Sequence, residues 1–129
     1  MKLKLKAMLA LGAVMALPAG AMADEIAVIV KTTNSNFWQN VNKGASAAIE
    51  GTGLTMTFDG PAAESAVADE VNLVDNAVNR GVKGIVLAPS DPDALAPAVK
   101  RANDAGIAVA IIDSALGDAA AGPYHTFLA

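Results

Sequence analysis

The sequence predicts an α/β fold built on a doubly wound parallel sheet, with the strands in the order 2-1-3-4-5. Two observations predict it. From residue 24 onward, strand-like apolar runs alternate with helix-like amphipathic segments, the pattern of successive strand–helix–strand units. The first run, residues 26–30 (IAVIV), is apolar at every position, as is typical of a strand with both faces buried. Such a strand lies inside a sheet that helices cover on both sides.

Residues 1–23 have the features of a secretory signal peptide rather than of the domain. Three lysines lie within the first six residues, and an apolar stretch follows over Ala7–Leu17. Ala21–Ala23 then forms an A-x-A cleavage site. An N-terminal membrane anchor is the alternative, but the apolar stretch is short for a bilayer span. We therefore expect an exported domain over residues 24–129.

The composition of that domain narrows its function. Residues 24–129 carry six basic and thirteen acidic side chains, a formal net charge of −7, which disfavours binding to nucleic acid. The chain has no cysteine, which excludes disulfides, cysteine-based zinc sites and a lipid attached to cysteine. An exported chain without an anchor belongs in the periplasm or outside the cell.

The first half of the domain predicts two strands and two helices. Ile26–Val30 and Leu54–Phe58 are the expected strands, and Phe37–Ile49 and Glu64–Arg80 the expected helices. The second helix has the clearest pattern, because four valines recur at i, i+4, i+7 and i+11 and form one apolar stripe. These valines are Val67, Val71, Val74 and Val78.

The second half predicts three more strands and one helix. Gly84–Ala88, Ile107–Ile112 and Tyr124–Leu128 are the expected strands, and the helix covers roughly Asp93–Asp104. Pro97 lies within that helix, where proline removes a backbone hydrogen bond at a cost of about 3 kcal/mol. We therefore expect an irregular first turn and a regular helix that begins near Pro97.

Polar side chains follow the first, third and fourth strands, whose loops meet at one crevice in this strand order. Amides, carboxylates and hydroxyls form directional bonds with the hydroxyls of a sugar, and aromatic rings cover its C–H face. This inventory predicts a sugar-binding site. The candidate residues are Asn34, Ser35, Asn36, Phe37, Trp38, Ser90, Asp91, Asp113 and Ser114.

Several candidates have a plain structural alternative. Phe37 and Trp38 are about as consistent with packing as with ligand binding, and one can serve each role. Asp91 is favoured as a helix N-cap, whereas Asp113, at the end of an apolar strand, is favoured as a functional residue. His125, the only histidine, is interpreted as a strand residue rather than a catalyst. No metal-binding cluster or glycine-rich phosphate loop is present in the sequence, so we expect no cofactor.

An ordered series of segments resembles one protein family. The series comprises IAVIVKTTNSNFWQNVNKGA at residues 26–45, GPAAESAVADEVNLVDNAVNRGVKGIVLAPSDPDALAPAVKRANDAGIAVAIIDS at residues 60–114, and the terminal YHTFLA. It is similar to the periplasmic sugar-binding proteins of ABC importers, in the ribose-binding-protein-like branch of the type I fold. The resemblance implies that Phe37 and Trp38 stack on the sugar, that Asn34 to Asn36 contribute polar contacts, and that Asp113 binds sugar hydroxyls.

The chain departs from the family in three respects. Ala88 and Ser114 stand where many relatives have asparagine and arginine, so the ligand need not be ribose. The family has two lobes joined by a hinge, and residues 24–129 correspond to most of the first lobe. We therefore expect a fragment of a longer product or a truncated gene.

The resemblance implies a non-enzymatic, monomeric solute-binding protein that delivers a monosaccharide or related polyol to an ABC permease. A periplasmic sugar sensor that feeds a chemoreceptor or signalling partner is the alternative. A sugar-responsive transcription regulator requires an N-terminal helix-turn-helix, where this chain has its signal-like segment. An exported α/β hydrolase or flavodoxin-like protein requires a nucleophile elbow or a phosphate loop, and the sequence has neither.

Overall fold

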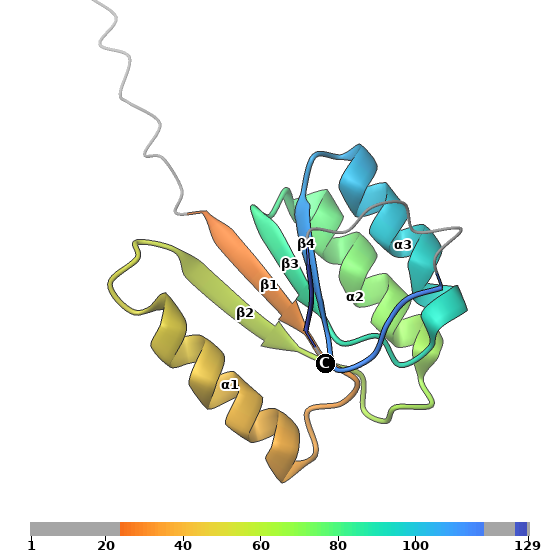
Figure 1. Cartoon of the computed structure of the whole chain (residues 1–129), viewed down its shortest axis with the longest axis horizontal. Helices are drawn as coiled ribbons and strands as arrows, with labels where there is room; N and C mark the ends of the chain where they lie inside the picture. The colour runs from red at the N-terminus through yellow and green to blue at the C-terminus, as the bar shows by residue number, and fades with distance from the viewer. Residues whose placement is uncertain (1–23, 118–125, 129) are drawn as a thin grey trace, which may run out of the picture.

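The computed structural model describes residues 24–117 and 126–128, so residues 1–23 and His125 lie outside the described part. All of its strands pair in parallel, in the order β2-β1-β3-β4-β5, which confirms the predicted sheet (Figure 1). The elements are β1 (Glu25–Ile29), α1 (Asn36–Ile49), β2 (Thr55–Asp59), α2 (Val67–Arg80), β3 (Gly84–Leu87), α3 (Pro92–Asp104), β4 (Ala108–Ile112) and β5 (Thr126–Leu128).

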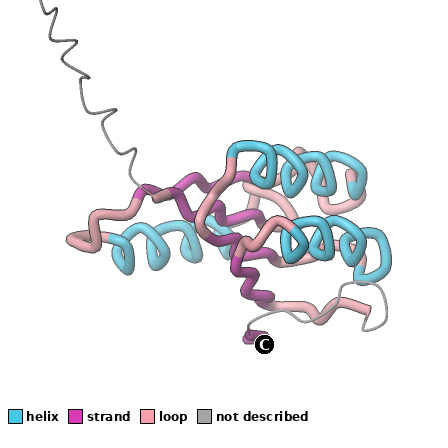
Figure 2. The backbone as a smooth tube through the Cα atoms, turned by 90° about the horizontal axis from the view of Figure 1, so that it is seen from above, coloured by secondary structure: helices cyan, strands magenta, loops and turns pink. Residues whose placement is uncertain are grey.

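Helices cover both faces of the sheet, as the apolar β1 requires. Figures 1 and 2 show α1 on one side and α2 with α3 on the other. Ala27 and Ile29 belong to the core under α2 and α3, whereas Val28 and Val30 belong to the core under α1. Consecutive side chains of β1 therefore point into two different cores, which explains why the strand is apolar throughout.

The larger core lies between the sheet and the α2–α3 pair. The predicted valine stripe of α2 packs there, with Val74 fully buried and the other three valines partly buried. Leu95 and Val99 of α3 meet Ile85 and Leu87 of β3 in the same core. The core under α1 is smaller, and an apolar hollow of about 290 Å³ remains between α1 and the strands β1, β2 and β3.

Helix α1 begins at Asn36, one residue before the predicted start, and the first turns of α2 and α3 differ further from the sequence prediction. Helix α2 begins at Val67 rather than Glu64, because a turn precedes it in which the Ala66 N–H donates to the Ala63 carbonyl at 3.0 Å. Helix α3 begins at Pro92 and continues through Pro97, so the expected irregular first turn is wrong.

The capping of α3 explains why its first turn is regular. One carboxylate oxygen of Asp91 accepts from the backbone N–H groups of Asp93 and Ala94, and Pro92 occupies the first helical position, where its missing N–H costs nothing. Pro97 lies on the exposed side of the helix. The backbone carbonyl that it leaves without a helical partner can therefore bond with water instead.

Trp38 is the largest side chain of the core under α1 and is only 3% exposed. We predict that Trp38→Ala lowers the free energy of unfolding by about 3–5 kcal/mol, because it leaves a cavity in that core. Urea unfolding followed by circular dichroism measures the loss. Phe37→Ala is the matched control, since Phe37 is 59% exposed and its removal creates no cavity. Equal losses in the two variants would contradict this assignment of the core.

Candidate functional site

The polar loops lie together at the carboxyl edge of the sheet. Residues 30–35 follow β1, residues 88–91 follow β3, and residues 113–117 follow β4. Since β1, β3 and β4 are consecutive neighbours in a parallel sheet, all three loops leave the same edge side by side. The structure therefore brings the loops that carry the sequence-predicted residues to one edge.

Lys31, Asp113 and Ser114 form a cluster at this edge. The Lys31 ammonium lies 2.7 Å from the Asp113 carboxylate and donates to the Ser114 hydroxyl at 2.7 Å. The Ser114 hydroxyl also donates to the Asp113 carboxylate at 3.0 Å. These contacts connect the loop after β1 to the end of β4, across the intervening β3.

Asp113 combines a left-handed backbone conformation with a carboxylate that is partly exposed at the edge. Its φ angle is 65°, in the left-handed region that a short polar side chain such as aspartate tolerates better than most. The hydrogen bond from Lys31 is the main cause that lowers the pKa of Asp113, with further help from Ser114 and opposition from burial. The carboxylate therefore stays ionised well into the acid range and accepts hydrogen bonds from neutral donors such as hydroxyls.

The first loop is held mainly by its own hydrogen bonds. The Ser35 hydroxyl accepts from the backbone N–H of Trp38 at 3.3 Å, which makes Ser35 the N-cap of α1. The Asn34 side-chain amide donates to the Ala62 carbonyl at 2.7 Å and ties this loop to the segment before α2. Asn36 is the first residue of α1 and is exposed. Asn34 and Ser35 thus shape the loop, and contact of any of the three with a ligand stays a prediction.

The two adjacent aromatic rings have different environments. Trp38 is buried against Val28, Val30 and Ala88, whereas Phe37 is 59% exposed beside the first loop. Their ring centroids lie 4.8 Å apart at an interplanar angle of 80°, so the edge of one ring meets the face of the other. Trp38 therefore packs in this core and Phe37 retains an exposed aromatic surface, and contact of either ring with a ligand stays a prediction.

The third loop is fixed by two carboxylates. Asp91 is the N-cap of α3, as the sequence favoured, and this leaves its role toward a ligand untested. The backbone N–H of Ser90 donates to Glu70 of α2 at 3.0 Å, and the Ser90 hydroxyl bonds with the same Glu70 oxygen. Glu70 itself is fully buried.

Sequence reasoning missed Lys31 and Glu70. Lys31 directly follows the apolar run of β1, but its partner Asp113 is far away in sequence, and only the sheet topology brings the two together. Glu70 did carry a signal, because it lies three residues after Val67 and four before Val74, on the apolar stripe of α2. An acid on a buried stripe indicates a specific partner inside the fold.

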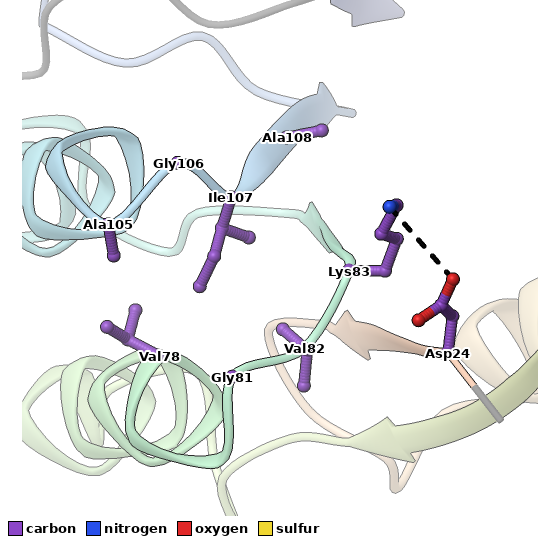
Figure 3. A pocket seen from close by; sticks show the side chains of 9 residues that line it. All are labelled: Asp24, Val78, Gly81, Val82, Lys83, Ala105, Gly106, Ile107 and Ala108. Atoms are coloured by element: carbon purple, nitrogen blue, oxygen red, sulfur yellow. Dashed lines mark ion pairs between the residues drawn. The ribbon is translucent and has the colours of Figure 1, made fainter. Parts of the chain in front are cut away.

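A second hollow, of about 330 Å³, lies at the opposite edge of the sheet (Figure 3). Its lining is mostly apolar or glycine and comes from the ends of α2 and α3 and the residues before β3 and β4. Lys83 and Asp24 face each other there at 4.0 Å, both largely exposed. This hollow has no set of converging polar side chains comparable to the cluster at the carboxyl edge.

The described residues contain no group of three or more His, Asp or Glu side chains placed to hold a metal ion. Within this part of the chain, every helix is too short or too polar to cross a membrane.

The ion pair at the edge predicts a pH dependence of stability. Because the pKa of Asp113 is lower in the folded chain than in the unfolded one, the pair stabilises the fold above about pH 4 and this contribution disappears as the pH falls further. Lys31→Met should cost about 1 kcal/mol or less near neutral pH, since the pair is partly exposed. The difference from wild type, measured by urea unfolding, should shrink at acid pH. Lys43→Met, on the exposed surface of α1, is the control that should show no such trend.

Known proteins resemble the chain over part of their length. The D-ribose/D-allose-binding protein of Pseudomonas aeruginosa is 32% identical over 91 residues, which cover 69% of this chain and 28% of that protein. The ribose import binding protein RbsB of Escherichia coli is 34% identical over 100 residues, which cover 74% of this chain and 32% of that protein. The chain thus spans about a third of the length of these relatives.

A solved structure matches more strongly. The solute-binding protein of an ABC transporter from Agrobacterium vitis, crystallised with bound D-fucose, is 66% identical and superposes with a TM-score of 0.79, over 81% of this chain and 37% of that one. The family of the periplasmic binding protein domain matches residues 26–127, which is nearly all of the chain after the signal-like segment. On this match and the shared fold, the chain belongs to the periplasmic binding protein domain family.

Proposed function

We propose that this protein is the solute-binding component of an ABC sugar importer and delivers a monosaccharide to a membrane permease. The observation that carries the proposal is the carboxyl edge of the sheet, where an ionised Asp113 and the Lys31 ammonium lie on neighbouring loops, and the exposed ring of Phe37 lies at the start of α1 beside the first loop. Carboxylates and ammonium groups bond with hydroxyls, and an exposed ring covers the apolar face of a sugar. No chemical step is part of this function.

Each group at the edge has a distinct role in the proposed complex. Asp113 accepts hydrogen bonds from sugar hydroxyls, and Lys31 donates to sugar oxygens once the ligand competes for its contacts. Phe37 packs against the C–H face of the ring. Ser90 adds a hydroxyl from the third loop, and Ser114 adds one beside Asp113. A second lobe closing over this edge would bury the ligand, which is a hinge-type change.

The sugar is proposed to be a hexose or deoxyhexose rather than ribose. The relative with bound D-fucose is 66% identical to this chain, whereas the D-ribose/D-allose-binding protein and the ribose-binding RbsB are 32% and 34% identical. Ala88 and Ser114 also stand where the family resemblance places asparagine and arginine in many relatives, which agrees with a sugar other than ribose. We further propose that residues 1–23 direct export and that the protein acts in the periplasm.

Asp113→Asn should weaken the affinity of the full-length protein for D-fucose by about tenfold or more, because a hydrogen bond to a charged group is worth at least ~1.5 kcal/mol. Isothermal titration calorimetry measures the change. Asp104→Asn is the matched control, since Asp104 lies at the end of α3, at the opposite edge of the sheet. Unchanged affinity in Asp113→Asn would refute the site, and a wild-type protein that binds no monosaccharide would refute the function.

Phe37→Ala should weaken sugar affinity by about fivefold to tenfold through loss of ring contact, because an aromatic contact is worth roughly 1 kcal/mol beyond the area it buries. Phe37→Tyr should retain most of the affinity, since it keeps the ring. The thermal midpoint of both variants should match wild type, because the side chain is exposed. A loss of affinity in Phe37→Tyr equal to that in Phe37→Ala would show that the ring does not bind the sugar.

A further inference from the structure

Glu70 is the one acidic side chain that is fully buried in the described part of the chain. It projects from the first turn of α2 toward the loop after β3. Its Oε2 atom accepts from the Ser90 backbone N–H at 3.0 Å and bonds with the Ser90 hydroxyl. Its Oε1 atom is buried and has no hydrogen-bond partner among the described residues.

A buried carboxyl group with hydrogen bonds at only one of its two oxygens lowers the stability of the fold, which suggests that Glu70 has a function that offsets this cost. A buried polar group without a partner loses its bonds to water and gains none in return. The position lies on the apolar stripe of α2, between Val67 and Val74, where leucine or methionine would pack without that cost. Both bonds of Glu70 go to Ser90, which stands at the carboxyl edge. The contacts therefore link the acid to the sugar site rather than to general packing.

We propose that Glu70 is a positioning residue, which fixes the loop at residues 88–91 and sets the direction in which the Ser90 hydroxyl bonds with the ligand. The proposal rests on the proposed function, since it concerns the same sugar site. Glu70 acts from behind the loop and touches no ligand itself, because its side chain is fully buried.

The direction of the Ser90 hydroxyl follows from the proton on Glu70. When Glu70 is ionised, the Ser90 hydroxyl must donate to Oε2, and its oxygen presents only lone pairs to a ligand. When Glu70 is protonated at Oε2, the carboxyl donates to the Ser90 oxygen, and the Ser90 hydrogen becomes free to donate to a sugar oxygen. The Ser90 backbone N–H keeps its bond to Oε2 in both states. The proton on Glu70 thus determines whether the Ser90 hydroxyl acts as an acceptor or a donor toward the ligand, and the loop does not have to move.

The environment of Glu70 causes it to be protonated at a higher pH than an exposed glutamate. Burial is the largest influence and raises the pKa of Glu70, against the hydrogen bonds from Ser90 and the charge of Lys31, which lower it, while Glu64 raises it further. Asp91, next to Ser90, directs its carboxylate to the N-terminus of α3.

Asp113 stays ionised across this pH range, because its own pKa is lowered. Since Asp113 accepts hydrogen bonds from sugar hydroxyls, the sugar oxygens beside it need donors. Protonated Glu70, which frees the Ser90 hydrogen, should therefore favour binding.

The test is the pH profile of sugar affinity in the full-length protein, with D-fucose as the probe. Titration calorimetry between about pH 4.5 and about pH 8 should show wild-type affinity rising by about threefold or more toward acid pH. Glu70→Gln removes the proton but keeps an oxygen that accepts from Ser90, so its affinity should vary little with pH. Glu70→Leu removes both hydrogen bonds to Ser90, and the sugar affinity of this variant should fall by about fivefold or more at every pH.

Three controls separate the possible outcomes. Asp69→Asn, an exposed acid on the same helix, should keep the wild-type pH profile. Ser90→Ala should abolish the pH dependence of sugar affinity, as Glu70→Gln does. Combining Ser90→Ala with Glu70→Gln should change this pH dependence no further. A pH step that survives in Glu70→Gln or Ser90→Ala would overturn the positioning role while sugar binding stands. A wild-type protein that binds none of D-fucose, D-allose and D-ribose would overturn the proposed function and this inference with it.

Discussion

The burial of β1 at the centre of the sheet is the constraint on which the polar edge depends. Hydrogen-bonded strands lie along both edges of β1, and apolar cores cover both of its faces. The position of its carboxyl end relative to the other strands is therefore fixed. Neighbouring strands lie about 4.8 Å apart, which sets the ends of β1 and β4 about 10 Å apart across β3. Only a long side chain spans much of that gap, and Lys31 does so to meet Asp113. A shorter side chain at this position would leave Asp113 without its partner.

The sheet could be predicted because it is determined by local sequence patterns. The contacts at its edge join residues that are distant in sequence, so they could not be predicted in the same way. Apolar runs and valine spacing identify strands and helix faces one element at a time, and parallel strands then leave few possible orders. Adjacent helical residues point about 100° apart, so Phe37 and Trp38 had to face different environments, but the sequence alone does not say which is buried. The pairing of Lys31 with Asp113, and of Glu70 with Ser90, requires the folded topology. Capping by Asp91 makes the first turn of α3 regular, and the penalty expected for Pro97 alone does not take this contribution into account.

Two carboxylates near the edge are shifted in opposite directions by the same physical rules. Asp113 is partly exposed and accepts a hydrogen bond from an ammonium group, so its ionised form is favoured and its pKa is lowered. Glu70 is buried and bonds only with neutral donors, so desolvation prevails and its pKa is raised. One acid therefore keeps its charge at the edge, while the other takes up a proton at a higher pH than an exposed glutamate does. This division suits a site that needs a fixed acceptor and an adjustable hydroxyl.

The ion pair between Lys31 and Asp113 links two loops at the edge of the sheet but contributes little to the free energy of folding. A pair held deep in the interior would cost several kcal/mol to break, because each charge would be left without solvent. This pair keeps 18% and 35% of its side-chain surfaces exposed, which places its net contribution nearer ~1 kcal/mol or less. In the proposed complex, a neutral sugar that offers hydroxyls to both groups would replace that small energy with hydrogen bonds to each charge. Partial exposure of the pair is thus compatible with the proposed exchange for a ligand, whereas full burial would favour a permanent structural link.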